Sequence, residues 1–276
     1  DGANANFNLD LDTWTIDKMT WGSVIGSSSS SSFYYNSVAD IAVNVLSGGS
    51  NGDTLMYIYD YNTKTFSNLI PGVSTKSLYY LAMKSDGTKV VYRTPNGLFM
   101  VDTSTKAITT LSSNTDDESY GEVKFTPDGQ KVVFFRVGLN PTPNNLFVVD
   151  IDGSNLTQLS NYTATTLFAG IETYEISPDG STVVYYGEVN YWPGVKELYR
   201  VDIDGSNNLR VHSSLVGTSK DIMGDIYIAP DSSYFVFSGD ITTDTVNEVY
   251  AADIDGSNMR RLNPTSNANR DANVST

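Results

Sequence analysis

Three nearly identical six-residue segments place carboxylate and amide oxygens at a fixed spacing. Each has the sequence Asp-Ile-Asp-Gly-Ser-Asn, at 150–155, 202–207 and 253–258. Such oxygens suit Ca²⁺, but an EF-hand loop has glycine at its sixth position and a bidentate glutamate at its twelfth. Here glycine is fourth and no glutamate follows at that spacing. We therefore expect hairpin turns whose side chains bond to their own backbone, with neither a metal nor a cofactor.

The residues that would form a nucleophile and its base do not lie together in the sequence. Segment 48–52, Gly-Gly-Ser-Asn-Gly, matches the pattern Gly-x-Ser-x-Gly, which places serine between a strand and a helix with a histidine in reach. Here a strand-like run follows at 54–59, and His212, the only histidine, lies far along the chain. We expect a loop at 48–52 and an edge or surface position, without catalytic function, for His212.

Carboxylates and aromatic side chains are the other candidates for chemistry. A glycosidase needs two carboxylates about 5–9 Å apart across a sugar, and 32 acidic residues make such pairs unavoidable. The densest group, 116–118, is expected in a solvated loop, and Glu172, Glu175 and Glu188 follow it. Tyr191 and Trp192 are different, because they fall between two strand-like runs. They are a candidate binding loop, since exposed tyrosine and tryptophan suit sugar or protein surfaces.

Composition excludes several classes of protein. The chain has 276 residues, a formal net charge of -15, no cysteine and one histidine. These counts exclude a disulfide scaffold, a cysteine nucleophile, a thiolate zinc cluster and a paired-histidine metal site. An acidic surface repels phosphate and anionic lipid, so we expect no nucleic acid partner. No run approaches the ~20 apolar residues of a membrane helix, so we expect no membrane insertion.

Several features favour an exported protein. The chain starts at Asp1 rather than methionine, has a serine run at 27–32 and is only 18% charged. We expect that a secretory signal has been removed and that the protein is extracellular or in the cell envelope. Three Asn-x-Ser/Thr sequons are candidate glycosylation sites, at Asn155, Asn161 and Asn273.

The three turns belong to a longer repeat. An apolar run precedes each of them, and a second turn lies about 22 residues upstream, at 127–129, 178–180 and, in the degenerate form Pro-Asp-Ser, at 230–232. A strand-like run follows each second turn, at 132–135, 183–186 and 234–237. Looser copies end at Asp102 and Asp60. Four antiparallel strands in about 45 residues are typical of one β-propeller blade.

The spacing also predicts the number of blades. The aspartate that opens each late turn falls at 60, 102, 150, 202 and 253, and one more step back ends at Asp17, after the run 14–16. At the other end, Ala272, Asn273, Val274 and Ser275 resemble a first strand whose partners lie at the N-terminus. We therefore predict one all-β domain over 1–276. It is a six-bladed β-propeller of four-stranded antiparallel blades, one blade combining three N-terminal strands with one C-terminal strand.

The repeat resembles a known family. Segments 126–129 and 177–180, taken with 146–155 and 198–207, are similar to the WD40-like (PD40) repeat of TolB-type propellers. The resemblance implies a six-bladed propeller that serves as a protein-binding module of the cell envelope or as a non-catalytic propeller attached to a peptidase. The 276 residues show neither the N-terminal domain of TolB nor a hydrolase domain, so neither envelope transport nor peptidase activity is expected.

Several functions follow as hypotheses. The first is a non-catalytic extracellular propeller that acts as a structural or protein-interaction module. In a sharper version, strand 272–276 completes the shared blade of the next molecule instead of its own, which gives a head-to-tail fibre. The alternative from another class is a carbohydrate-active enzyme that uses carboxylates in the central funnel, and a ligand or metal sensor is a third. The expected partners are a protein, a second copy of the chain, or a glycan.

Overall fold

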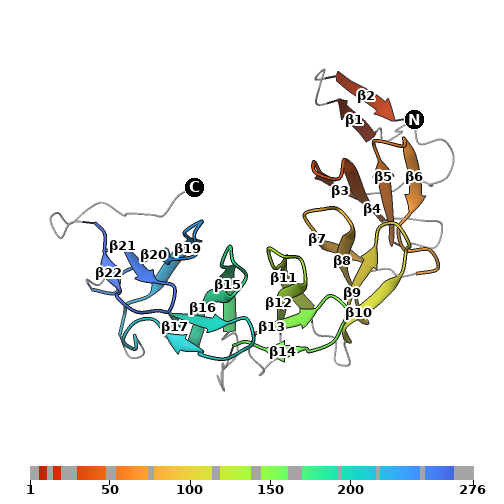
Figure 1. Cartoon of the computed structure of the whole chain (residues 1–276). Coiled ribbons are helices and arrows are strands. Elements are labelled where there is room, and N and C mark those ends of the chain that lie inside the picture. Colours follow the sequence, from red (N-terminus) through yellow and green to blue (C-terminus); the bar gives the residue numbers. More distant parts are fainter. Residues whose placement is uncertain are drawn as a thin grey trace. The chain divides into compact units, whose positions relative to one another are not determined.

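The computed structural model describes eleven stretches of the chain: 6–10, 15–19, 30–47, 54–73, 78–113, 119–137, 144–160, 170–191, 194–215, 218–242 and 246–263. All regular elements in these stretches are β-strands, twenty-two in number (Figure 1). No helix in the described part of the chain has the length and hydropathy to cross a membrane. The chain divides into two compact units, Asp1–Thr110 and Leu111–Thr276, which are described separately.

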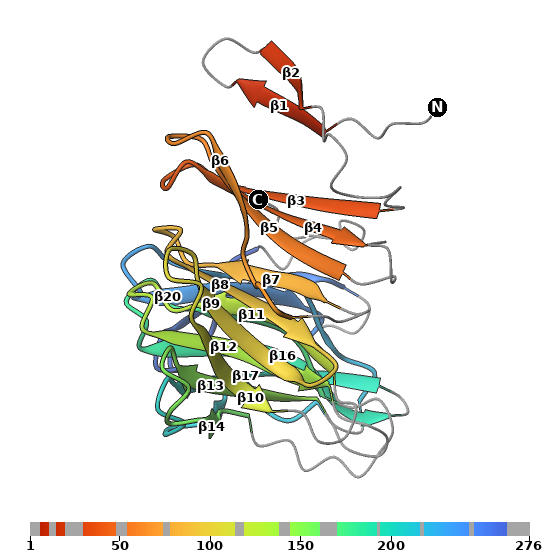
Figure 2. The same cartoon turned by 90° about the vertical axis from the view of Figure 1, so that its right-hand side faces the viewer.

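The first unit contains a hairpin and two sheets. The hairpin pairs β1 (Asn6–Asp10) with β2 (Thr15–Met19). The first four-stranded sheet runs in chain order through β3 (Ser30–Asn36), β4 (Ile41–Ser47), β5 (Thr54–Asp60) and β6 (Thr65–Asn68), with β3, β4 and β5 side by side (Figure 2). The second sheet contains β7 (Tyr79–Met83), β8 (Lys89–Thr94), β9 (Gly97–Asp102) and β10 (Ile108–Ser113), whose last residues belong to the second unit.

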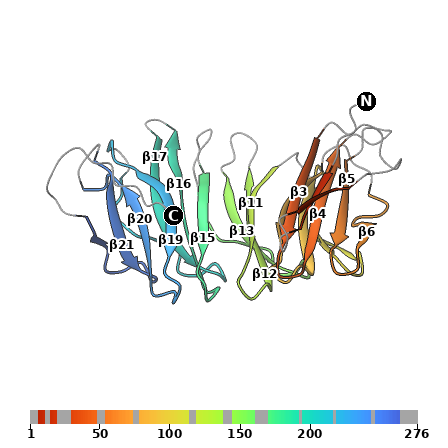
Figure 3. The same ribbon diagram turned by 90° about the horizontal axis from the view of Figure 1, so that it is seen from above.

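The second unit contains three more four-stranded sheets, each antiparallel and in chain order (Figure 3). The third sheet has β11 (Ser119–Phe125), β12 (Lys131–Val137), β13 (Asn145–Asp150) and β14 (Thr157–Gln158). The fourth has β15 (Gly170–Ile176), β16 (Thr182–Tyr191), β17 (Gly194–Asp202) and β18 (Leu209–Arg210). The fifth has β19 (Ile222–Ile228), β20 (Tyr234–Gly239), β21 (Glu248–Asp253) and β22 (Arg260–Arg261).

The predicted turns join the predicted strands. In the Pro-Asp-Gly turns, the Asp128 and Asp179 carboxylates accept backbone N–H groups two residues on, and Gly129 and Gly180 have φ of 66° and 75°. Ser232 takes the same left-handed conformation, φ 59°, in the degenerate turn. Asparagine, aspartate and glycine tolerate these conformations, which is why the turns punctuate the sequence so regularly.

The fourth sheet buries both of its faces. On the fourth sheet, Tyr185 and Val201 pack against the third sheet, and Val184 and Leu198 pack against the fifth. We call the face toward the preceding sheet the back face and the other the front face. Because successive residues of a strand point to opposite faces, the strands are almost continuously apolar.

The prediction of four-stranded antiparallel sheets is confirmed for five sheets, and the N-terminal part of the prediction needs a correction. Asp17 was expected to end its strand as Asp60 ends β5, but it lies inside β2, paired with Asn8. Its neighbours continue the ladder to Met19, so this hairpin does not follow the repeat. The predicted strand 272–276 lies outside the described residues.

Candidate functional site

The Asp-Ile-Asp-Gly-Ser-Asn segments form tight β-hairpin turns between the third and fourth strands of their sheets. The first aspartate of each accepts the Asn Nδ2–H of the same turn, at 2.8 Å for Asp150, 2.6 Å for Asp202 and 2.7 Å for Asp253. The second aspartate accepts the serine N–H at 2.8–2.9 Å. These serine hydrogen bonds hold the pKa of Asp152, Asp204 and Asp255 below the ordinary value. The turn oxygens therefore serve the backbone. Among the described residues, no group of three or more His, Cys, Asp or Glu is arranged to hold a metal ion.

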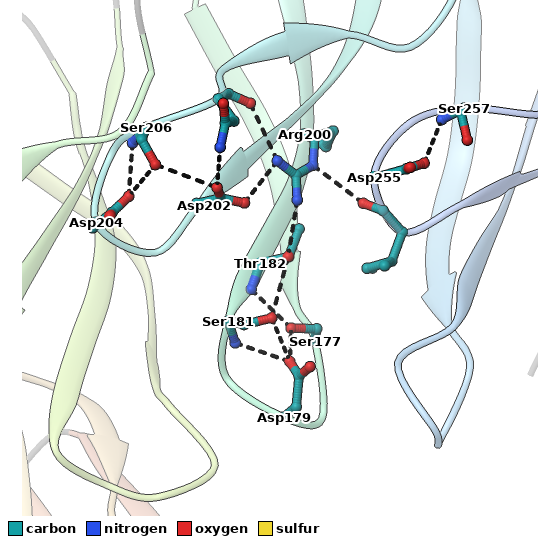
Figure 4. A network of polar contacts seen from close by, with 12 residues as sticks. Ser177, Asp179, Ser181, Thr182, Arg200, Asp202, Asp204, Ser206, Asp255 and Ser257 are labelled. Carbon is teal, nitrogen blue, oxygen red and sulfur yellow. Dashed lines mark hydrogen bonds and ion pairs between the residues drawn. The ribbon is translucent and has the colours of Figure 1, made fainter.

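A buried arginine connects two of these turns (Figure 4). Arg200 on β17 pairs with Asp202 at 2.7 Å and donates to the Ile254 carbonyl oxygen of the next sheet at 3.1 Å. It also donates to the Thr182 hydroxyl of its own sheet at 3.1 Å. Its stem lies 3.3 Å from where a Cβ on Gly256 would be. The ion pair orients the guanidinium within the fourth sheet, and the hydrogen bond to Ile254 O links that sheet to the fifth.

At the opposite end of the strands, two glutamates are buried beside arginines. Glu197 on β17 accepts from Arg210 at 3.1 Å, from the Leu215 N–H at 2.9 Å and from the Tyr199 hydroxyl at 2.8 Å. Burial alone raises the pKa of Glu197, but these hydrogen bonds outweigh it and hold the pKa below the ordinary value. An ionised carboxylate with this many donors is not a proton donor for catalysis.

Glu248 repeats this arrangement in the fifth sheet. It is fully buried, pairs with Arg261 and accepts the Tyr250 hydroxyl and the Thr242 N–H, the last at 3.1 Å. These bonds also outweigh burial and lower its pKa. The sequence signal was available, since Glu-x-Tyr is followed thirteen residues after the glutamate by arginine in both repeats.

His212 has a structural position. The Leu198 N–H donates to its Nε2 at 3.0 Å, so Nδ1 carries the proton and donates to the Ser213 carbonyl oxygen at 2.7 Å. Burial lowers its pKa, which keeps the ring neutral. Ser160 Oγ and Asn263 Oδ1 accept the equivalent N–H groups of Leu146 and Val249. The histidine is thus one of three interchangeable acceptors that close the end of a sheet.

The back face of the first sheet departs from the pattern of the others. In the other four sheets, a buried aromatic residue on the second strand stacks on an aromatic partner directly across on the third strand. The ring centroids are 5.5–5.8 Å apart, and the pairs are Tyr92–Phe99, Phe134–Phe147, Tyr185–Tyr199 and Phe237–Tyr250. The first sheet has Asn44 opposite Tyr57. Asn44 is only 5% exposed, and no described residue donates to its Oδ1.

Tyr57, directly across from Asn44, and four other aromatic residues of the first sheet and its turn make ring contacts with one another. Tyr57 stacks on Phe66 at 4.8 Å, and Tyr61 meets Tyr35 and Tyr59 edge-on at 5.6 and 4.7 Å. Phe66 and Tyr35 are 37% and 40% exposed. We call these five aromatic residues and Asn44 the first back face.

Tyr61 holds an informative position within the first back face. Its N–H donates to Asp40 O just as the Ile203 and Ile254 N–H groups donate to the equivalent carbonyls of Ser181 and Ser233. Those two isoleucines pack on the sheet that precedes their own. Tyr61 therefore holds the position from which Ile203 and Ile254 contact the preceding sheet.

The second sheet carries a substitution at the same position. Thr103, whose N–H donates to Thr88 O, stands where the later turns have isoleucine. Beside it lies a cavity of about 200 Å³ lined by Ile41, Ile58, Asp60, Thr65, Ser67, Thr103, Ser104 and Lys106. The smaller, polar side chain leaves this space between the two sheets of the first unit.

The other predicted site residues are scattered or lie outside the described stretches. Asn155 is exposed in its turn, with φ 55°. Tyr191 ends β16 opposite Gly194, so the candidate binding loop is a hairpin tip. Outside the described residues lie 48–52, 116–118, Asn161, Trp192 and 272–276.

Comparisons with known proteins identify the fold. No protein-family model and no curated protein matches the chain. Among solved structures, an oligogalacturonate lyase in complex with manganese is 15% identical, with a TM-score of 0.51, covering 84% of this chain and 72% of that one. A putative TolB from Agrobacterium tumefaciens is 15% identical, with a TM-score of 0.46, covering 83% and 79%. The β-propeller domain of the Trilobed protease from Pyrococcus furiosus is 13% identical, with a TM-score of 0.48, covering 83% and 69%. At these identities the likeness is one of fold, and the chain is an all-β protein whose five four-stranded antiparallel sheets match β-propeller structures.

Proposed function

We propose that this chain is a non-catalytic, extracellular β-propeller that acts as a structural or protein-interaction module. Its sixth blade combines the N-terminal hairpin region with the C-terminal strand 272–276. One observation carries the proposal: the first back face has the aromatic surface and the Tyr61 position of a joint between sheets, together with a buried amide oxygen that lacks a donor among the described residues.

The ionisable groups support a non-catalytic function. The carboxylates of Glu197 and Glu248 are paired with arginines and accept backbone N–H groups, and both ring nitrogens of His212 make hydrogen bonds. A catalytic carboxyl or imidazole has to face its substrate with a pKa suited to proton transfer. These three side chains meet neither condition, because each accepts a backbone N–H group near the end of a strand.

A specific observation favours a second candidate, a head-to-tail fibre. The joints within the two units have stacked aromatic pairs, whereas the first back face has Asn44 at the equivalent position. A polar group that needs one matching donor gives an interface specificity for its partner. Such a joint suits a strand or sheet supplied by another molecule, with 272–276 of one copy completing the shared blade of the next.

Removal of residues 270–276 tests both candidates. If the C-terminal strand closes its own ring, the shortened chain is a monomer with a lower unfolding temperature, because the first back face becomes exposed. If the strand is exchanged, the intact chain forms long assemblies by electron microscopy and the shortened chain is a folded monomer. An intact chain and a shortened chain with the same stability and the same size contradict the proposal.

Matched single substitutions separate strand pairing from simple loss of residues. Val274→Pro removes one backbone donor from the strand and is expected to act like the deletion. Asn273→Gln keeps every backbone donor and removes the sequon, so it is expected to behave like the intact chain. The enzyme hypothesis is tested separately, by assaying the intact chain for hydrolase and lyase activity on a panel of polysaccharides. We expect no turnover.

A further inference from the structure

The joint between the fourth and fifth sheets is closed by a carboxylate. Asp221 lies just before β19, and its Oδ1 accepts the Lys196 N–H of β17 at 2.5 Å and the Ile222 N–H at 3.0 Å. The Asp221 N–H donates in turn to the carboxylate of Asp240, which is 2% exposed and follows β20. One half-buried side chain therefore connects the backbones of two neighbouring sheets.

At the equivalent place between the third and fourth sheets, the contact is made by the backbone. Asn144 directly precedes Asn145, the first residue of β13. Lys196 precedes Glu197 at the same place in the fourth sheet, so Asn144 and Lys196 are equivalent positions. The Ile171 N–H donates to Asn144 O at 3.2 Å, and Asn144 forms an isolated bridge with Gly170. A Cβ on Gly170 would lie 2.4 Å from the Asn144 nitrogen, so only glycine allows this approach. The two joints hold the same place in the repeat with different chemistry.

Charged groups surround Asp221 from every element that packs against it. Lys196 of β17 is the only cation directed at this cluster among the described residues, and it is paired with Glu172 of β15 at 2.8 Å. Lys220 donates away from the cluster, to the carbonyl oxygens of Ile241 and Thr242. Tyr186 and Glu188 of β16 also lie near this ammonium group, Asp240 lies near Asp221, and Asp225 of β19 interacts with Tyr186. Three carboxylates, those of Glu172, Glu188 and Asp221, thus share the Lys196 ammonium group.

We propose that Asp221 makes the joint between the fourth and fifth sheets a proton-sensitive clasp, which is tightened in mild acid and loosened at neutral and alkaline pH. When ionised, the carboxylate is partly removed from water and lies near the carboxylate of Asp240. Opening the joint returns the charge to water and away from its neighbours. Protonation removes this electrostatic gain from opening. The oxygen that is not protonated still accepts both backbone hydrogen bonds.

The direction of the pKa shift agrees with this geometry. Burial, with a smaller contribution from Asp240, raises the pKa of Asp221 from 3.8 to about 6, against the lowering effect of the Lys196 N–H and ammonium. Burial and Glu172 raise the pKa of Glu188 as well. A raised pKa means that the folded chain binds the proton more tightly than the unfolded chain. The stabilisation is therefore complete below 3.8 and is lost as the pH rises through about 6.

Substitution of Asp221 tests the clasp. From pH 7.5 to pH 5.0, the folding equilibrium constant of the intact chain is expected to rise roughly tenfold from this group alone. Asp221→Asn keeps an oxygen for both backbone donors and cannot ionise, so it is expected to be more stable at pH 7.5 and to lose this rise. Asp225→Asn is the matched control, since it removes an exposed carboxylate of the same strand that holds no other sheet; it is expected to keep the rise.

Hydrogen exchange of the intact chain gives a second reading that needs no variant. After correction for intrinsic rates, protection of the Lys196 amide is expected to fall from pH 5.0 to pH 7.5. Protection of the Ile171 amide, at the backbone-closed joint, is expected to stay constant. The proposal is overturned if the two amides respond alike, or if Asp221→Asn shows the same pH dependence of stability as the intact chain.

Discussion

At the scale of single residues, the side chains that suggest chemistry are used to satisfy backbone groups at strand ends. His212, Ser160 and Asn263 accept equivalent N–H groups in three successive sheets. What the position requires is an acceptor of suitable reach, because a buried N–H without one is costly. The identity of the residue is therefore secondary, and a lone histidine carries no functional meaning here.

Two variants of His212 are expected to separate these requirements. His212→Asn retains an acceptor for the Leu198 N–H and is expected to cost less than about 1 kcal/mol of unfolding free energy. His212→Ala leaves that N–H buried and unpaired and is expected to cost about 1–3 kcal/mol. Denaturant unfolding at pH 7 measures both. Equal losses for the two variants contradict the acceptor role.

At the scale of elements, the hairpin turns determine how the sheets respond to acid. Side-chain and backbone donors lower the pKa of the turn aspartates, for example of Asp86 to about 2, where the Lys84 ammonium and Thr88 donate to its carboxylate. Serine hydroxyl and backbone donors lower the pKa of Asp179, and the Thr126 hydroxyl and the Gln130 N–H lower the pKa of Asp128. A lowered pKa means that the folded chain releases the proton more readily than the unfolded chain.

The turns therefore predict an acid limit to stability. Their contribution is present above about pH 4 and is lost as the pH falls through the folded values toward 2. Combined with the opposite sign at Asp221, this predicts maximal stability near pH 4–5. Unfolding midpoints in urea from pH 2 to pH 8 measure the profile. A maximum at neutral pH contradicts the assignment of signs to these two sets of groups.

The turn of the second sheet offers a stabilising substitution. Thr103→Ile restores the residue found in the three later turns and fills part of the adjoining cavity. It also removes the bond from the Thr103 hydroxyl to Gly87 O, 2.9 Å long. At about 0.8 kcal/mol per buried methylene and about 1 kcal/mol per hydrogen bond, the net gain is expected to be about 0.5–1 kcal/mol. Thr105→Ile, at an exposed position of the same turn, is expected to give no gain. A lower unfolding free energy for Thr103→Ile would contradict the expectation that filling this cavity stabilises the sheet.

At the scale of the whole molecule, the repeat specifies the sheets, and individual residues specify how sheets join. Three joints within the two units have a stacked aromatic pair on the back face of their later sheet, and one of these joints adds the Asp221 carboxylate. The first back face has Asn44 opposite Tyr57 instead. The sheets therefore share one repeat but differ in the residues on their back faces.

Much of the fold was predictable from sequence because the signals are local. Turn chemistry at 127–129, 150–155 and their copies places most strands correctly, since glycine, proline and aspartate act within a few residues. The joints were not predictable in this way. Asn44, Tyr61 and Asp221 acquire meaning only when sheets far apart in sequence are brought face to face. The Asp17 prediction failed for a related reason, because equal spacing does not ensure that a weakly matching segment follows the repeat.

Oxidative footprinting of aromatic side chains tests most directly the claim that terminal segments cover the first back face. Tyr59, Tyr61 and Phe66 are compared in the intact chain and in the chain without residues 270–276, with Tyr79 of the second sheet, which is 51% exposed, as the internal reference. We predict slow oxidation of the three residues in the intact chain, faster oxidation after the deletion, and an unchanged rate at Tyr79. Equal rates in the two chains at Tyr59, Tyr61 and Phe66 would contradict it.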